Sequence, residues 1–201
     1  MDICTIRALY NDNTITIYQA YNKDIASFAV KHQTFIGSTF KRERMTWIKP
    51  SFLWMMYRSA WGTKENQEHI LAIKIKREGF EWALNNSCLS QFEKNLYSSY
   101  DDWKQLIAIS PVRVQWDPEK NILLQPLKYK SIQIGLSKEA IEKYVSDWIV
   151  QIDDITITCR KIEELVSNKQ IDQAENMLPQ EEIYPLPDDI KIKIGITSAF
   201  V

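Results

Sequence analysis

Alternation of apolar and polar residues is the clearest pattern along the chain, and it predicts β-strands. In residues 70–77, Leu71, Ile73 and Ile75 lie on one face, and lysines lie on the other. Several similar stretches are rich in β-branched residues, as strands are. The further strands predicted on these grounds are residues 14–18, 112–117, 131–136 and 149–157.

Helices are predicted between these strands from capping residues and helical spacing. Asn22 and Ser137 can each cap the first turn of a helix. In the helix predicted at residues 99–109, Trp103, Leu106 and Ile107 share a face that we expect to point inward. The predicted helices are residues 22–30, 80–89, 99–109, 137–148, 161–167 and 171–178.

The order of these elements predicts an α+β fold. Strands and helices do not follow strict βαβ alternation, so we expect one domain with a mixed or antiparallel sheet and packed helices. Residues 1–158 would form the α+β core domain. Residues 159–201, which begin with two short acidic helices, would form a helical C-terminal extension packed on that core.

The densest stretch of the chain is residues 44–61, RMTWIKPSFLWMMYRSAW. Pro50 fits the first turn of a helix and forces Lys49 to be extended. We therefore predict an extended segment at 45–49 and a helix at 50–60 that stops near the following glycine. A helix that is apolar nearly all round is typical of a buried core helix.

Three cations, Arg44, Lys49 and Arg58, interrupt this aromatic segment. Burying unpaired cations is costly, whereas cations beside aromatic rings suit a ligand that carries phosphate and a base. Both interpretations hold if the helix forms a wall and its polar ends form a pocket. The residues expected to bind such a nucleotide-like small molecule are Tyr21, Arg44, Thr46, Trp47, Lys49, Ser51, Trp54 and Arg58.

Composition and charge are those of a globular protein with no strong polyanion affinity. The 201 residues are 45% hydrophobic and 25% charged, and the net charge is −1. The charge is unevenly distributed, because residues 1–136 hold 18 basic and 13 acidic groups, whereas residues 137–189 hold 5 and 13. The N-terminal part is therefore the more plausible host for an anion.

Cysteine and histidine are too sparse to support several classes of site. Cys4, Cys88 and Cys159 are widely spaced, and His32 and His69 are the only histidines. We therefore expect reduced thiols, no disulfide framework and no metal site. The N-terminus lacks the order of a signal peptide and no apolar run approaches ~20 residues, so a cytoplasmic protein with no membrane association is expected.

Several strings of residues resemble the uncharacterised bacterial and fungal family filed as domain of unknown function 4291. The longest string is residues 44–59, and the match runs in order from about residue 6 to residue 195. The family label implies kinship and carries no activity. The other strings are residues 14–21, 112–119, 131–136, 148–150 and 184–187.

The order of elements is also similar to that of the ADP-ribosyltransferases. A first strand ends at a Gln19–Tyr21 tip, a helix follows, and a later strand bears Thr46. In that fold the first strand ends in His or Arg and a catalytic Glu lies on a late strand; here Gln19 and Gln133 stand at those places. The resemblance implies NAD as the cofactor, a catalytic role for Gln19 and Gln133, and stacking of nicotinamide on Trp47 or Tyr21.

The same resemblance implies a need for a carboxylate. Cleaving the glycosidic bond of NAD builds oxocarbenium character, which a nearby negative charge stabilises. Asp117 or Glu119, in a turn predicted after the strand at 112–117, would supply it. Arg44 or Arg58 would bind the diphosphate.

Two other interpretations remain open at the level of the sequence. The chain could be a non-enzymatic nucleotide-binding or nucleic-acid-binding module, because basic residues also interleave with aromatics there. Each catalytic candidate also has a structural interpretation: Asp117 and Glu119 as exposed turn residues, and Gln19 and Gln133 as strand residues bonded to backbone. The sequence gives no oligomeric state.

Overall fold

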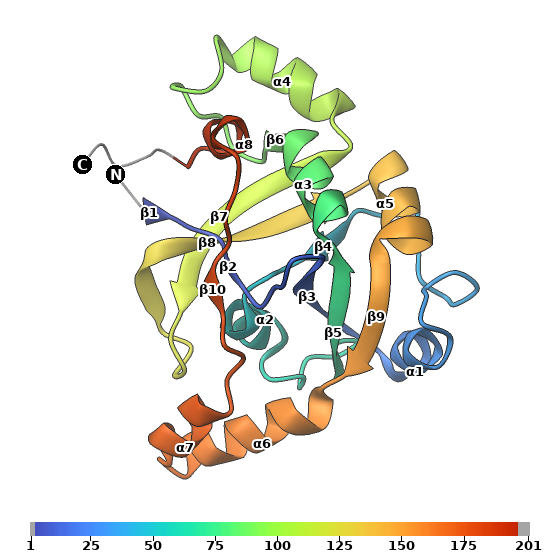
Figure 1. Ribbon diagram of the computed structural model, residues 1–201, viewed down its shortest axis with the longest axis vertical. Coiled ribbons are helices and arrows are strands. Elements are labelled where there is room, and N and C mark those ends of the chain that lie inside the picture. The colour runs from blue at the N-terminus through green and yellow to red at the C-terminus, as the bar shows by residue number, and fades with distance from the viewer. Residues whose placement is uncertain (1–2, 197–201) are drawn as a thin grey trace.

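A five-stranded mixed sheet runs through the centre of the molecule in the computed structural model, which describes residues 3–196 (Figure 1). Its strand order is β1 (Ile3–Cys4), β8 (Pro126–Leu136), β7 (Val112–Lys120) and β6 (Ser87–Leu89). β4 (Thr46–Ile48) pairs antiparallel with the end of β8. β1 and β6 pair parallel with their neighbours, and β7 pairs antiparallel with β8.

A second sheet is antiparallel throughout and consists of β3 (Thr14–Tyr21), β5 (His69–Lys76) and β9 (Ile149–Asp154). One backbone contact links the two sheets, because Tyr18 N donates to Lys49 O at 2.7 Å directly after β4. This contact joins the middle of β3 to the residue that follows β4. The remaining strands, β2 (Arg7–Ala8) and β10 (Glu182–Ile183), form a short antiparallel pair.

Helices cover both ends of this arrangement. In Figure 1, α4 lies at one end of the long axis, and α6 and α7 lie at the other. The predicted cap at Asn22 is confirmed, since its side chain accepts from Ile25 N at 3.1 Å. The helices are α1 (Lys23–His32), α2 (Phe52–Ser59), α3 (Arg77–Asn85), α4 (Tyr100–Ile109), α5 (Glu139–Lys143), the π-helix η1 (Tyr144–Trp148), α6 (Thr156–Ser167), α7 (Ile171–Asn176) and α8 (Asp188–Lys193).

Two apolar clusters form the core. The larger one contains buried residues of both sheets, such as Ile73 and Ile134. The smaller one joins α2 to the C-terminal helices, with Phe52 and Met56 beside Ile162. These clusters confirm the predicted α+β fold and the buried central helix. Within residues 3–196, no helix has both the length and the apolar character needed to cross a membrane.

The structure corrects three helix predictions. The helix predicted at 80–89 ends at Asn85, because the next residues pair with β7 as β6. Leu106 does not face inward, since it is 46% exposed and α4 has no buried residue. Ser137 does not cap α5; its hydroxyl donates to Pro111 O at 2.9 Å instead.

The turn predicted at Asp117 is also wrong. β7 continues through Asp117, Pro118 and Glu119, with a register shift after Pro118, and the chain reverses only after Lys120. Proline is tolerated in a strand at such a bulge, because the local ladder is already interrupted. Asp117 and Glu119 are therefore strand residues, and neither is the exposed turn carboxylate of the structural interpretation.

Candidate functional site

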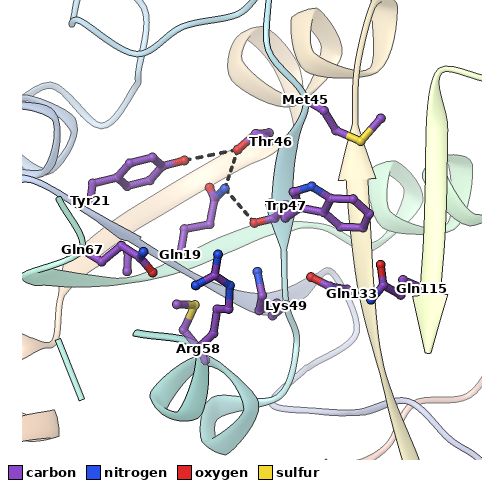
Figure 2. A pocket seen from close by; sticks show the side chains of 12 residues that line it. Gln19, Tyr21, Met45, Thr46, Trp47, Lys49, Arg58, Gln67, Gln115 and Gln133 are labelled. Carbon is purple, nitrogen blue, oxygen red and sulfur yellow. Dashed lines mark hydrogen bonds between the residues drawn. The ribbon is translucent and has the colours of Figure 1, made fainter. Parts of the chain in front are cut away.

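A polar cavity of about 400 Å³ opens where β3, β4, α2 and β8 meet (Figure 2). Seven of the twelve candidate site residues line it: Gln19, Tyr21, Thr46, Trp47, Lys49, Arg58 and Gln133. The other lining residues are Ala20, Met45, Met55, Gln67 and Gln115.

Lys49 is the unusual charge in this cavity. Its side chain is buried, with the residue 5% exposed, and its ammonium has no hydrogen bond or ion pair with any residue in 3–196. Burial lowers the pKa of Lys49 to about 8, and repulsion from Arg58 contributes, while Asp117 opposes the shift. Figure 2 shows Lys49 and the exposed Arg58 side by side, pointing into the same space. The cavity therefore holds two cations and no paired anion.

Gln19 is held rigidly at the back of the cavity. Its Nε2 donates to Thr46 Oγ1 at 2.8 Å and to Trp47 O at 3.1 Å. Its Oε1 accepts from the buried Tyr144 hydroxyl, on the π-helix, at 2.7 Å. Tyr21 OH lies 3.4 Å from the same Thr46 oxygen. Because its whole amide is engaged, Gln19 fastens β3 to β4.

Gly135, which has no side chain, leaves room for the ring of Trp47 at the edge of the cavity. Trp47 lies opposite Gly135 in the β4–β8 pairing. A Cβ at Gly135 would lie 2.6 Å from Met45 Sδ and 3.1 Å from Trp47 Cη2. The indole therefore lies over a strand position that only glycine leaves open, and its ring borders the cavity beside Gln133 (Figure 2).

Asp117 lies next to this cavity and orders two of its glutamines. Its Oδ1 accepts from Gln115 Nε2 at 2.9 Å, and its Oδ2 accepts from Gln133 Nε2 at 2.7 Å. Gln115 was not among the sequence candidates, although the alternation in β7 places it on the same face as Asp117. Gln67, in the loop before β5, gave no recognisable signal.

Ser51 and Glu119 belong to a different cavity, of about 390 Å³, which Glu181 also lines. Glu119 is 4% exposed, and its Oε1 accepts from Ser51 Oγ at 2.9 Å. Glu181 Oε1 accepts from Phe52 N, at the start of α2, at 2.7 Å. Burial raises the pKa of Glu181 to about 8, with Glu119 contributing. Asp117 and Glu119, the two carboxylates proposed from the sequence, therefore lie beside different cavities.

Because the pKa of Glu181 is raised, we expect the stability of the protein to depend on pH. Its pKa is higher in the folded than in the unfolded chain, so the folded state binds more protons between about pH 4.5 and about pH 8. The free energy of unfolding should fall across that range, by at most about 1.4 kcal/mol per pH unit from this group. In Glu181→Gln, urea unfolding measured at several pH values should lack this component.

The neighbouring glutamate provides the matched control for that experiment. Glu182 is exposed, so Glu182→Gln should keep the pH dependence of the native chain. Parallel stability curves for the native chain and Glu181→Gln would show that the Glu181 carboxyl is not perturbed.

Arg44 and Trp54 do not line either cavity. Arg44 is exposed. Trp54 is buried and stacks on Tyr57 with ring centroids 5.1 Å apart, while Lys120 Nζ lies 3.8 Å from the centroid of Tyr57. Lys120 therefore supplies a cation to the Trp54 and Tyr57 rings, while Trp54 Nε1 is buried without a hydrogen-bond partner in the described part of the chain.

A model of the family described as "Domain of unknown function (DUF4291)" matches residues 5–184. No curated protein matches the chain. Across residues 3–196, no group of three or more His, Cys, Asp and Glu side chains could hold a metal ion.

Proposed function

The chain belongs to the DUF4291 family, whose description names no activity. We propose from the polar cavity that the protein binds a nucleotide that carries phosphate, with NAD as the first candidate. The observation that carries this proposal is Lys49, a buried residue whose ammonium lies beside Arg58 and has no hydrogen bond or ion pair within residues 3–196.

The two cations of the cavity, Lys49 and Arg58, favour the binding of an anion. A buried cation without a partner is costly, and a second cation beside it adds repulsion. A phosphate or diphosphate group placed between Lys49 and Arg58 would remove both penalties and accept charge-assisted hydrogen bonds. Arg58, which projects from the last turn of α2, can also present two parallel donors to phosphate oxygens.

The rest of the lining favours a nucleotide over a simple phosphate. Trp47 and Tyr21 offer aromatic surface, and the glutamines offer hydrogen-bonding groups for a base or ring. The cavity also falls within the range of about 300–1,000 Å³ that is typical of small-molecule sites. A nucleotide, with its ring, sugar and phosphate, can contact all three kinds of lining group: the aromatic rings, the glutamine amides and the two cations.

The proposed reaction is cleavage of the glycosidic bond of NAD, as in ADP-ribosyltransferases. The bond between ribose and nicotinamide breaks, nicotinamide leaves with the bonding electrons, and an acceptor such as water then bonds to the ribose carbon and loses its proton. Asp117, held behind two lining glutamines, supplies a negative charge near the developing cation. Glu119 takes no part, because it lies in the other cavity.

Thermal unfolding with added ligands tests the proposal. NAD or ADP-ribose at about 100 times its dissociation constant should stabilise the protein by about 2.7 kcal/mol. Short single-stranded RNA or DNA should have little effect, because the net charge is −1 and the proposed binding groups lie together in one cavity, which provides no track for a polynucleotide. Stabilisation by RNA or DNA alone would replace this proposal with the binding-module interpretation, and nicotinamide release would then not occur.

A further inference from the structure

Gln115, Asp117 and Gln133 form a hydrogen-bonded group on one face of β7 and β8. Gln115 lies directly opposite Gln133 in the antiparallel register, and Asp117 follows two residues after Gln115. The Asp117 carboxylate accepts one hydrogen bond from each glutamine, at 2.9 Å and 2.7 Å. Both glutamines line the cavity, whereas Asp117 does not.

This group fixes which end of each glutamine amide faces the ligand. An ionised carboxylate can only accept hydrogen bonds, so each glutamine must turn its NH₂ group toward Asp117. Each carbonyl oxygen therefore points elsewhere, and neither accepts a hydrogen bond from any residue in 3–196. Figure 2 shows the oxygen of Gln133 turned toward Lys49, with Gln115 beside it.

The wall of the cavity is therefore divided by charge. Two unpartnered carbonyl oxygens lie on the β7–β8 side, with the negative charge of Asp117 behind them. Two cations, Lys49 and Arg58, lie on the α2 side. A ligand that fits both sides carries hydrogen-bond donors and positive charge at one end and phosphate at the other.

We infer that Asp117 orients Gln115 and Gln133 as a clamp for the carboxamide NH₂ of an oxidised nicotinamide nucleotide. This inference rests on the proposed function and names the residues of the same site that select the nicotinamide end of the substrate. The two N–H groups of the carboxamide match the two glutamine oxygens, and the positively charged pyridinium ring is favoured by the carbonyl dipoles and by Asp117. The adenine end is neutral and gains less from this charge.

Analogues of NAD that differ by one group test the clamp. In nicotinic acid adenine dinucleotide, a carboxylate replaces the carboxamide and would face two carbonyl oxygens. It should bind at least about 100-fold more weakly than NAD, because buried acceptors are left unpaired and like charges approach. Nicotinamide hypoxanthine dinucleotide, altered only at the adenine, should bind within about threefold of NAD.

Variants of the positioning residue give a readout that a merely structural role would not move. In Asp117→Asn, the side chain donates as well as accepts, so one glutamine must turn its NH₂ group toward the ligand. The preference for NAD over nicotinic acid adenine dinucleotide should fall to less than about tenfold. Asp117→Glu keeps an acceptor-only group and should retain part of the preference, and circular dichroism checks that both variants fold.

The outcomes separate the clamp from the proposed function. Equal binding of NAD and nicotinic acid adenine dinucleotide to the native protein would overturn the clamp and leave nucleotide binding intact. A preference that survives in Asp117→Asn would also overturn it. If none of the dinucleotides binds, the proposed function and the clamp both fail.

Discussion

Replacing Lys49 with methionine is expected to weaken NAD binding by about 100-fold while making the protein more stable. The affinity falls because a desolvated, charge-assisted contact to phosphate is lost. Stability rises because the native lysine is buried with no hydrogen bond or ion pair in residues 3–196, and the same desolvation lowers its pKa to about 8. The free energy of unfolding should increase by about 2 kcal/mol.

Arg44→Met is the matched control, because Arg44 lies in the same segment but is exposed and does not line the cavity. It should change neither affinity nor stability measurably. Isothermal titration with NAD and urea unfolding of the two variants give both quantities. A Lys49→Met protein that loses stability and keeps its NAD affinity would show that the ammonium has a structural partner and no ligand.

The central segment shows what local sequence can predict. Pro50 and the apolar helix after it place the boundary between β4 and α2 close to the predicted position, although α2 begins at Phe52 and Pro50 lies before its first turn. Ser51, the residue after Pro50, caps α2 by accepting from Trp54 N at 3.2 Å. Strands with strict alternation, such as β5, were predicted for the same reason: periodicity is a local property, and burial of one face enforces it.

The assembly of the cavity depends on register, which local pattern does not contain. Gln115 meets Gln133 only because β7 continues past Pro118 and reverses after Lys120. A turn at Asp117 would have placed different residues opposite one another. The sequence therefore indicated Gln133 and Asp117 but not Gln115, the second glutamine that donates to Asp117.

Residues that are neighbours in the chain can line different cavities, and this is a second limit on what the sequence predicts about the site. Lys49 and Ser51 are two positions apart, yet they line different cavities. Lys49 ends the extended segment after β4, whereas Ser51 is the cap of α2, so the chain changes conformation between them. Proximity in sequence was therefore a poor guide to which carboxylate lies near the cations, and Glu119 lies with Ser51 instead.

Replacing Gly79 with alanine is expected to destabilise the protein by about 2 kcal/mol, although alanine is normally favoured by about 1 kcal/mol inside a helix. Gly79 lies in α3, and a Cβ there would be 2.6 Å from Cδ1 and 2.7 Å from Cδ2 of Trp148. Trp148 is itself buried at the end of η1, so its ring cannot move aside without disturbing the core. Urea unfolding of Gly79→Ala measures the effect.

A double variant identifies the cause of that loss. In Trp148→Ala the ring atoms that the added methyl group would meet (Cγ, Cδ1 and Cδ2) are removed, so Gly79→Ala should cost less in this background than in the native chain. The difference between the two costs measures the clash directly. An equal cost in both backgrounds would point to the backbone of α3, and a stabilised Gly79→Ala would mean that α3 and η1 pack less closely than the structure shows.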